Sequence, residues 1–277
     1  MPDRTDVVYE YDGSFEGLMC CVFESFLRHE TPCDVYNAYS GTAQATLYPV
    51  RSIETDPEKA RRVMTAIPRK VSPAAEDAVR GAFLSDQPGI EAEIIRFVKL
   101  GFRYGARVMT LLTDDTVRTV TKASGRVGTE SHLFKGFLRF SEYGRVLAAI
   151  IEPKCRILPY LVDHFTSRYP EEAFLIYDKT HREALVYRPY EAVIVPLQEL
   201  TLPTPGKDEQ QYRHMWKTFY DTIAVEGRTN PRCRMNHMPK WMWKHLTELN
   251  GEGGTVAGAG KALAAAPSPS LPDEGRL

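Results

Sequence analysis

The sequence lacks the features that mark membrane proteins, secreted proteins and nucleic-acid coat proteins. Its longest uncharged apolar runs, such as Val146 to Ile151, are far too short to span a bilayer, and the acidic and basic residues Asp3, Arg4 and Asp6 leave no apolar signal core at the N-terminus. Lys plus Arg total 35 and Asp plus Glu total 36, so the formal net charge is −1. That balance excludes a uniformly basic protein but not a local basic patch. We therefore expect a cytoplasmic protein without membrane contact.

Paired cysteines and phosphate loops are also missing. The five cysteines are odd in number and form no C-x-x-C pair, which favours a reducing compartment over a disulfide scaffold. Cys233 and His237 are four residues apart, but zinc needs three or four ligands and the other histidines are scattered. Gly258 to Lys261 resembles a Walker loop only superficially, because Thr255 replaces its first glycine and Ala262 its Ser/Thr. The sequence thus predicts neither a metal site nor a cofactor.

The pattern of elements predicts an α+β fold. We expect a single domain over residues 1–249, with a mainly helical part over 7–132 and a sheet with C-terminal helices over 133–249. Residues 250–277 are rich in Gly, Ala, Pro and Ser and hold almost no large apolar side chains, so they predict a disordered tail.

Capping residues mark the helices of the N-terminal part. A strand over 7–11 leads through Asp12-Gly13 to Ser14, whose hydroxyl can cap a helix over 15–28. A second strand is expected within 44–53. A helix is expected to start at Asp56-Pro57, and the pattern stays helical to about Gly105 with breaks near Pro73 and Pro88. A further long helix is expected from Asp114 to about His132.

The spacing of apolar residues changes after residue 133. Short apolar runs over 137–143, 146–152, 173–177 and 183–187 indicate strands, with a helix over 157–169 between the two pairs. The simplest arrangement of this strand–strand–helix–strand–strand unit is a small antiparallel sheet with the helix on one face. An irregular connector over 189–205 and helices over 210–226 and about 240–249 complete the prediction. In the first of these helices four apolar residues share one face and are expected in the core: Trp216, Phe219, Tyr220 and Ile223.

The segment from Arg228 to Thr247 combines cations with aromatic rings and contains no acid. Cations can contact phosphates through counterion release, tryptophan rings can stack on bases, and asparagine amides can contact base or sugar edges. The alternative is a basic helix end whose tryptophans belong to the core. The predicted nucleic-acid-binding residues of this segment are Arg228, Asn230, Arg232, Arg234, Lys240, Trp241, Trp243 and Lys244. Lys135 and Arg139 extend the predicted binding surface beyond it. A second basic cluster, Arg61, Arg62, Arg69 and Lys70, predicts only a solvated helix face.

Two short stretches carry residues suited to acid–base chemistry. Glu130 and His132 close a long helix and form one candidate pair, although residues two apart on a helix point apart and Glu130 also suits an ion pair with Arg126. Asp178 and His181 lie between two strands, where Asp178 also suits an ordinary turn. These four residues are the catalytic candidates; whether the chain is an enzyme stays open.

Several blocks together resemble a known family. They are Tyr11 to Gly17 (Y-D-G-S-F-E-G), Glu130 to Phe140 (E-S-H-L-F-K-G-F-L-R-F), Trp216 to Tyr220, Arg228 to Pro231 and Met238 to Lys244. The set is similar to a bacterial family of DNA-repair-associated (DNA-metabolism) proteins, a domain of unknown function, over about residues 7–249. Positions that match its recurrent pattern are His132, Gly136, Arg139, Phe140, Arg228, Asn230, Pro239 and Trp243.

The resemblance implies a DNA context and two protein partners. Family members are encoded beside a radical-SAM protein and are sometimes fused to a uracil-DNA-glycosylase domain. This chain has no such fused domain and no C-x-x-x-C-x-x-C motif, so we expect it neither to excise uracil alone nor to be the radical-SAM partner. The leading hypothesis is a DNA-binding accessory protein. The alternatives are an enzyme on damaged nucleic acid, with the four candidates in one cleft, and an adaptor for those partners with an exposed apolar patch.

Overall fold

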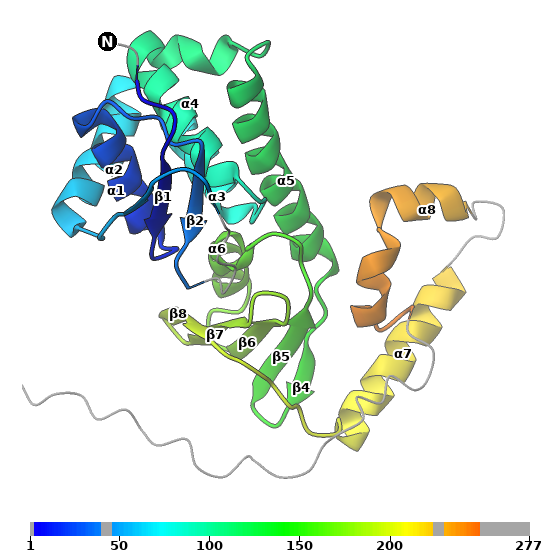
Figure 1. The fold of residues 1–277 in the computed structure, drawn as a ribbon. Coiled ribbons are helices and arrows are strands. Elements are labelled where there is room, and N and C mark those ends of the chain that lie inside the picture. Colours follow the sequence, from blue (N-terminus) through cyan, green and yellow to red (C-terminus); the bar gives the residue numbers. More distant parts are fainter. Residues whose placement is uncertain (1–2, 40–45, 224–229, 250–277) are drawn as a thin grey trace, which may run out of the picture.

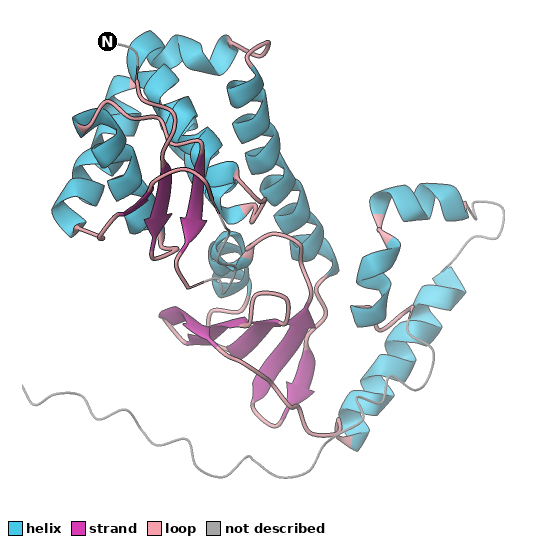
Figure 2. Ribbon diagram, viewed as in Figure 1, coloured by secondary structure: helices cyan, strands magenta, loops and turns pink. Residues whose placement is uncertain are grey.

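A computed structural model describes residues 3–39, 46–223 and 230–249. It confirms the α+β class, with a helical N-terminal half, small sheets and C-terminal helices (Figures 1 and 2). Arg228 and the expected tail over 250–277 lie outside the described residues. None of the described helices combines the length and the apolar composition that crossing a bilayer requires.

The N-terminal half contains a parallel sheet in the order β2-β1-β3, covered by helices. Of its strands, β1 was expected from the sequence, β3 lies inside the range expected for a second strand, and β2 was missed. The strands are β1 (Val8–Tyr11), β2 (Asp34–Asn37) and β3 (Val50–Ser52). The helices are α1 (Phe15–Leu27), α2 (Pro57–Lys70), α3 (Pro73–Leu84), α4 (Ile90–Tyr104), the 3-10 helix η1 (Gly105–Thr110) and α5 (Asp115–Phe137).

Local side-chain hydrogen bonds start these helices where the sequence predicts. Ser14 Oγ accepts from the backbone N–H of Gly17, and Asp56 and Asp114 accept from the first turns of α2 and α5. Gly13 has φ +80°, the left-handed conformation that lets the chain turn from β1 into α1. At Gly81 a Cβ atom would lie 2.2 Å from Ser124 Oγ, so this glycine permits the close packing of α3 on α5.

The C-terminal sheet has the order β4-β5-β6-β7-β8 and is mixed, not antiparallel as expected. Because α6 crosses over between β5 and β6, these two strands run parallel, while the other neighbours are antiparallel. The elements are β4 (Ser141–Tyr143), β5 (Val146–Ile151), α6 (Leu158–Arg168), β6 (Ala173–Asp178), β7 (Glu183–Arg188) and β8 (Glu191–Pro196). The edge strand β8 occupies part of the segment that was expected to be irregular.

Two apolar clusters form the core, and α5 contributes to both. Val117 and Val120 belong to the N-terminal cluster, whereas Val127 and Phe134 pack with α6 and the C-terminal sheet. Figure 1 shows α5 running from the N-terminal half down to that sheet. The end of α5 therefore holds its polar side chains at the junction of the two halves.

The last elements lie beside this body: α7 (Lys207–Ile223), α8 (Pro231–His237) and the 3-10 helix η3 (Lys240–His245). The prediction that the apolar face of α7 is core was wrong. Trp216, Phe219 and Ile223 are 41%, 52% and 58% exposed, Tyr220 is half-buried, and α7 has no buried residue. Figure 1 shows the reason, since α7 and α8 stand away from the rest of the fold.

Candidate nucleic-acid interface and acid–base clusters

The end of α5 separates Glu130 from His132. Glu130 lies on the buried face of the helix, where its carboxylate accepts hydrogen bonds from the backbone N–H groups of Lys154 (2.8 Å) and Cys155 (2.9 Å). Burial, together with this carboxylate, raises the pKa of the Cys155 thiol to about 12. His132 is exposed on α5. Glu130 thus fixes the turn after β5, and it does not pair with Arg126, which donates to Gln87 instead.

Asp178 and His181 do come together, in the turn between β6 and β7. The fully buried Asp178 accepts from the backbone N–H groups of Thr180 and His181 through Oδ1, and its Oδ2 lies 2.6 Å from His181 Nδ1. On the other side of the ring, Nε2 lies 3.7 Å from a carboxylate oxygen of Asp86 and has no hydrogen-bond partner among the described residues. Only 3% of the His181 side chain is exposed, so this cluster is closed to a macromolecular substrate.

A second cluster, which the sequence did not reveal, surrounds Glu152 at the end of β5. Lys244 of η3 forms an ion pair with Glu152, His245 Nε2 lies 3.4 Å from Glu152 Oε1, and Lys179 Nζ lies 4.0 Å from it. Partial burial alone would raise the pKa of the Glu152 carboxyl, but the bond to Lys244 and the nearby positive charges outweigh it, so the pKa lies below its ordinary value. Burial lowers the pKa of His245 against the attraction of Glu152.

The two histidine clusters lie at the ends of neighbouring strands and have different partners. Ile151, the last residue of β5, pairs with Asp178, the last residue of β6. Glu152 directly follows Ile151, and its partners come from η3 and from Lys179, whereas those of His181 are Asp178 and Asp86. Of the four catalytic candidates, Glu130 and His132 lie on different faces of α5, and among the described residues neither forms a hydrogen bond or ion pair with Asp178 or His181.

The basic-aromatic segment is only partly neutralised. Arg139 donates to Glu248 (2.8 Å) and also lies over the ring of Trp216, while Lys244 is held by Glu152. Among the described residues, four of the predicted cations have no carboxylate within ion-pair distance: Lys135, Arg232, Arg234 and Lys240. The cations of this predicted set that lack a carboxylate partner thus lie on α8, at the start of η3 and at the end of α5, where Lys135 is half-buried.

The polar and aromatic members of the segment have structural partners as well. Asn230 caps α8 by accepting from the N–H of Cys233 (3.0 Å). Trp241 is half-buried with its ring 5.6 Å from that of Phe134. Trp243 is also half-buried, donates to the carbonyl of Met238, and carries the Arg234 guanidinium at 5.0 Å from its ring. This Arg234–Trp243 stack places a guanidinium beside an indole ring, a combination that bases and phosphates can contact.

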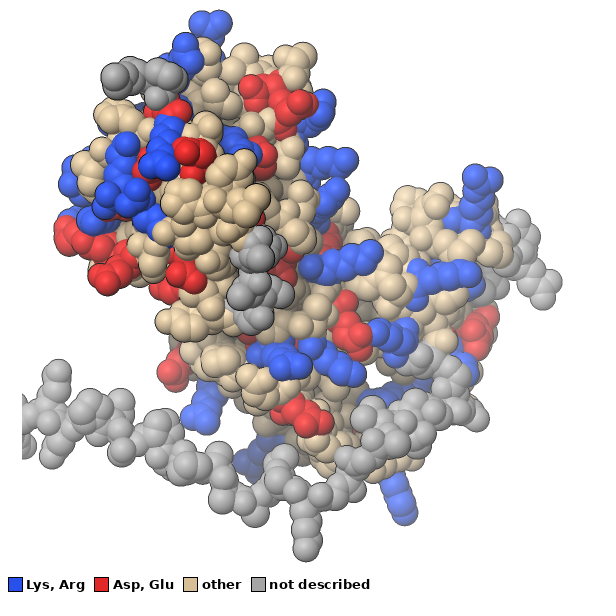
Figure 3. Space-filling view, viewed as in Figure 1, with Lys and Arg blue, Asp and Glu red and all other residues tan. Residues whose placement is uncertain are grey.

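Further cations extend this surface along α5. Lys122 and Arg126 are exposed and four residues apart, while Arg118, four residues before Lys122, is paired with Asp115 at 2.6 Å. Figure 3 shows Lys and Arg side chains along the side of the molecule where α5 runs and again over the C-terminal helices. The described residues contain no group of three or more His, Cys, Asp or Glu side chains placed to hold a metal ion.

Residues 88–248 match the family model DUF4130, a domain of unknown function. The chain belongs to this family. The DUF4130 segment runs from just before α4 to Glu248, so it contains the end of α5, the C-terminal sheet and the basic-aromatic segment. A search of the curated proteins and a search of the solved structures found no match.

Proposed function

We propose that this chain is a DNA-binding accessory protein of DNA repair or DNA metabolism that acts in the cytoplasm. The observation that carries the proposal is the set of cations on α8, η3 and α5 without carboxylate partners among the described residues, next to the Arg234–Trp243 stack. A partner that covers these cations must supply negative charge to compensate for their lost hydration. The phosphates of a nucleic acid supply it. The resemblance to DNA-repair-associated proteins also indicates DNA as the bound polyanion.

The phosphate contacts are assigned to Lys135, Arg232, Arg234 and Lys240. Arg139 and Lys244, which were predicted for the same role, already have their charges balanced by Glu248 and Glu152. Their role in this proposal is to hold η3 and the residues after it against β5 and α5. Trp243, with Arg234 on its ring, is the stacking residue.

The test is a titration of the full chain with labelled single strands, duplex and lesion-bearing duplex at two salt concentrations. Replacing Arg232 and Lys240 together by Gln removes two phosphate contacts, so the slope of log affinity against log salt on duplex falls by about 2. The matched control, Arg145→Gln with Arg188→Gln, removes two exposed charges of the C-terminal sheet and its β4–β5 turn and leaves that slope unchanged. Equal slopes for the two variants contradict the proposal.

A second candidate function, the protein adaptor, is favoured by the exposed apolar face of α7. Tyr212, Met215 and Phe219 are 63%, 57% and 52% exposed, which is unusual for one face of a helix. The partners in this proposal are the radical-SAM protein encoded beside family members and a uracil-DNA-glycosylase-like protein. Co-purification of the radical-SAM protein after nuclease treatment, and its loss in Phe219→Glu, support the adaptor; loss on nuclease treatment alone supports DNA binding only.

A further inference from the structure

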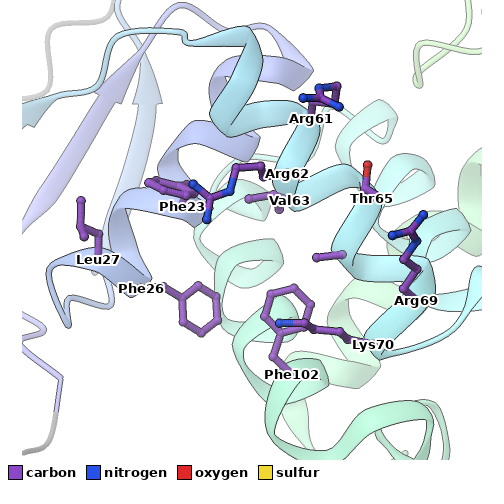
Figure 4. Close-up of a pocket in the computed structure, with 11 residues that line it drawn as sticks. Phe23, Phe26, Leu27, Arg61, Arg62, Val63, Thr65, Arg69, Lys70 and Phe102 are labelled. Carbon is purple, nitrogen blue, oxygen red and sulfur yellow. The ribbon is translucent and has the colours of Figure 1, made fainter.

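A pocket in the N-terminal half combines an aromatic floor with a cationic rim. It lies between α1, α2 and α4 and has a volume of about 780 Å³, within the range of ligand sites. Phe23 and Phe26 of α1 and Phe102 of α4 line it, and Arg61, Arg62, Arg69 and Lys70 of α2 surround it (Figure 4). The sequence predicted these four cations only as a solvated helix face.

The rim carries more positive charge than the surrounding protein balances. Arg61 is paired with Glu58 at 2.7 Å, but Arg62, Arg69 and Lys70 have no carboxylate within ion-pair distance among the described residues. None of the described residues that line the pocket is acidic. Arg69 and Lys70 suit the last turn of α2, where the helix dipole favours cations, yet that preference gives no reason for an apolar pocket beneath them.

The floor consists of aromatic rings, of which Phe26 is exposed and Phe23 and Phe102 are half-buried. The rings of Phe26 and Phe102 are 5.4 Å apart between centroids, and Phe26 is 37% exposed. Lys70 Nζ lies 5.5 Å from the centroid of Phe102, and Arg62 Cζ lies 5.1 Å from that of Phe23. On the side away from this pocket, Lys99 Nζ likewise lies 5.3 Å from the centroid of Phe26, so each ring of the floor has a cation beside it.

We propose that this pocket binds unpaired nucleotides of a single-stranded nucleic acid. Phosphates contact Arg62, Arg69 and Lys70, and a base stacks on Phe26 and Phe102. A duplex keeps its bases stacked inside and cannot present one to these rings, whereas a single strand can. An anionic lipid suits the pocket less well, because one headgroup would balance few of the three cations.

The identity of the polyanion rests on the proposed function, but the residues of the two sites are separate. Figure 1 places α2 and α8 on opposite sides of the molecule. All lining residues except Phe102 precede the DUF4130 segment. The pocket therefore adds a preference for single strands to the cationic surface of the C-terminal segment.

The experiment compares a fluorescein-labelled oligothymidylate with a duplex of equal length on the full chain. The triple variant Arg62→Gln, Arg69→Gln, Lys70→Gln lowers single-strand affinity at least tenfold and the salt slope by about 2, since each phosphate contact on a single strand contributes about 0.7. Its affinity for duplex stays within about twofold of wild type, because no pocket contact reaches a paired base. The charge-matched control, Arg145→Gln, Arg168→Gln, Arg188→Gln, changes neither.

Phe102→Leu and Phe26→Leu test the floor with the charge kept. Each lowers single-strand affinity about tenfold without changing the salt slope, as expected for loss of base stacking. Because Phe26 is exposed, its variant still tests the floor if Phe102→Leu fails to fold, and circular dichroism checks the folding of both variants.

Wild-type single-strand affinity in folded variants overturns the proposal. The proposal is also overturned if the triple variant and its control weaken single-strand binding equally. Binding of phosphatidylglycerol vesicles without binding of the oligonucleotide overturns it as well. The proposed function fails by a different result, namely duplex binding that is unchanged in the double variant Arg232→Gln, Lys240→Gln.

Discussion

Two amphipathic helices of this protein, α5 and α7, have the same kind of apolar pattern and opposite surroundings. On α5 the apolar face is wholly buried, with Val117, Val120 and Val127 closed from solvent by α3, α4 and α6. On α7 the corresponding face, which includes Trp216 and Phe219, remains exposed. Apolar periodicity therefore predicts a helix and its apolar side, but it does not predict whether anything in the same chain covers that side.

Polar contacts hold α7 in place instead of a core. Glu209 accepts from the backbone N–H of Glu142 in β4, and Arg213 donates to Ser141 Oγ. Trp216 Nε1 donates to Glu248 Oε2 at 3.1 Å. Hydrogen bonds at a partly exposed site add less to stability than burial of an aromatic side chain does, so α7 is the less firmly held of the two helices.

Deleting one phenylalanine side chain from α5 and one from α7 should change stability by very different amounts. Phe134→Ala on α5 removes a side chain that is 3% exposed and packs on Trp241, and it should lower the free energy of unfolding by about 3–5 kcal/mol. Phe219→Ala on α7 removes one that is 52% exposed and should cost less than about 0.5 kcal/mol. Urea unfolding measures both. Similar losses for the two variants would mean that the face of α7 is packed after all.

The ion pair between Arg139 and Glu248 joins the end of α5 to the residues after η3. The Glu248 side chain is 2% exposed, so Arg139→Ala leaves a buried carboxylate with Trp216 as its remaining side-chain donor and should cost about 2–3 kcal/mol near neutral pH.

The loss in Arg139→Ala should depend on pH. Burial alone would raise the pKa of the Glu248 carboxyl, but the bonds from Arg139 and Trp216 outweigh it and hold the pKa below its ordinary value. A depressed carboxyl pKa stabilises the fold above the unfolded value of about 4.3, and that stability disappears as the pH falls below it. The cost of Arg139→Ala should therefore shrink in acid, as measured by urea unfolding across this range. A cost that stays constant down to about pH 3 argues against the ion pair.

Sequence reasoning succeeded where the cause is local. Ser14, Asp56 and Asp114 were predicted to start helices, and each accepts backbone N–H groups of the turn that follows it. Asp178 and His181 were predicted together and meet within one turn, three residues apart. Such interactions depend on a few neighbouring residues, so spacing alone is enough to find them.

It failed where the partner comes from a distant part of the chain. Glu130 was matched with Arg126 by helical spacing, but its carboxylate serves the turn of Lys154 and Cys155. The partners of Glu152, namely Lys244 and His245, lie more than ninety residues further along. The crossover by α6 that makes β5 and β6 parallel is a tertiary choice, and the strand pattern alone is equally compatible with an antiparallel pair.

The smallest predicted effect concerns His245, the residue of η3 that faces Glu152 and neighbours Lys244. Burial holds the pKa of this imidazole below its ordinary value, so the unfolded chain takes up a proton more readily than the folded chain does. Stability should therefore fall slightly as the pH drops through about 6.5 and level off below the folded pKa. His245→Asn removes this titration, and urea midpoints at about pH 7.5 and about pH 5.5 should then differ less than in wild type. If the change in urea midpoint between the two pH values is the same in both proteins, another group causes the pH dependence. In that case η3 is not held by a neutral His245.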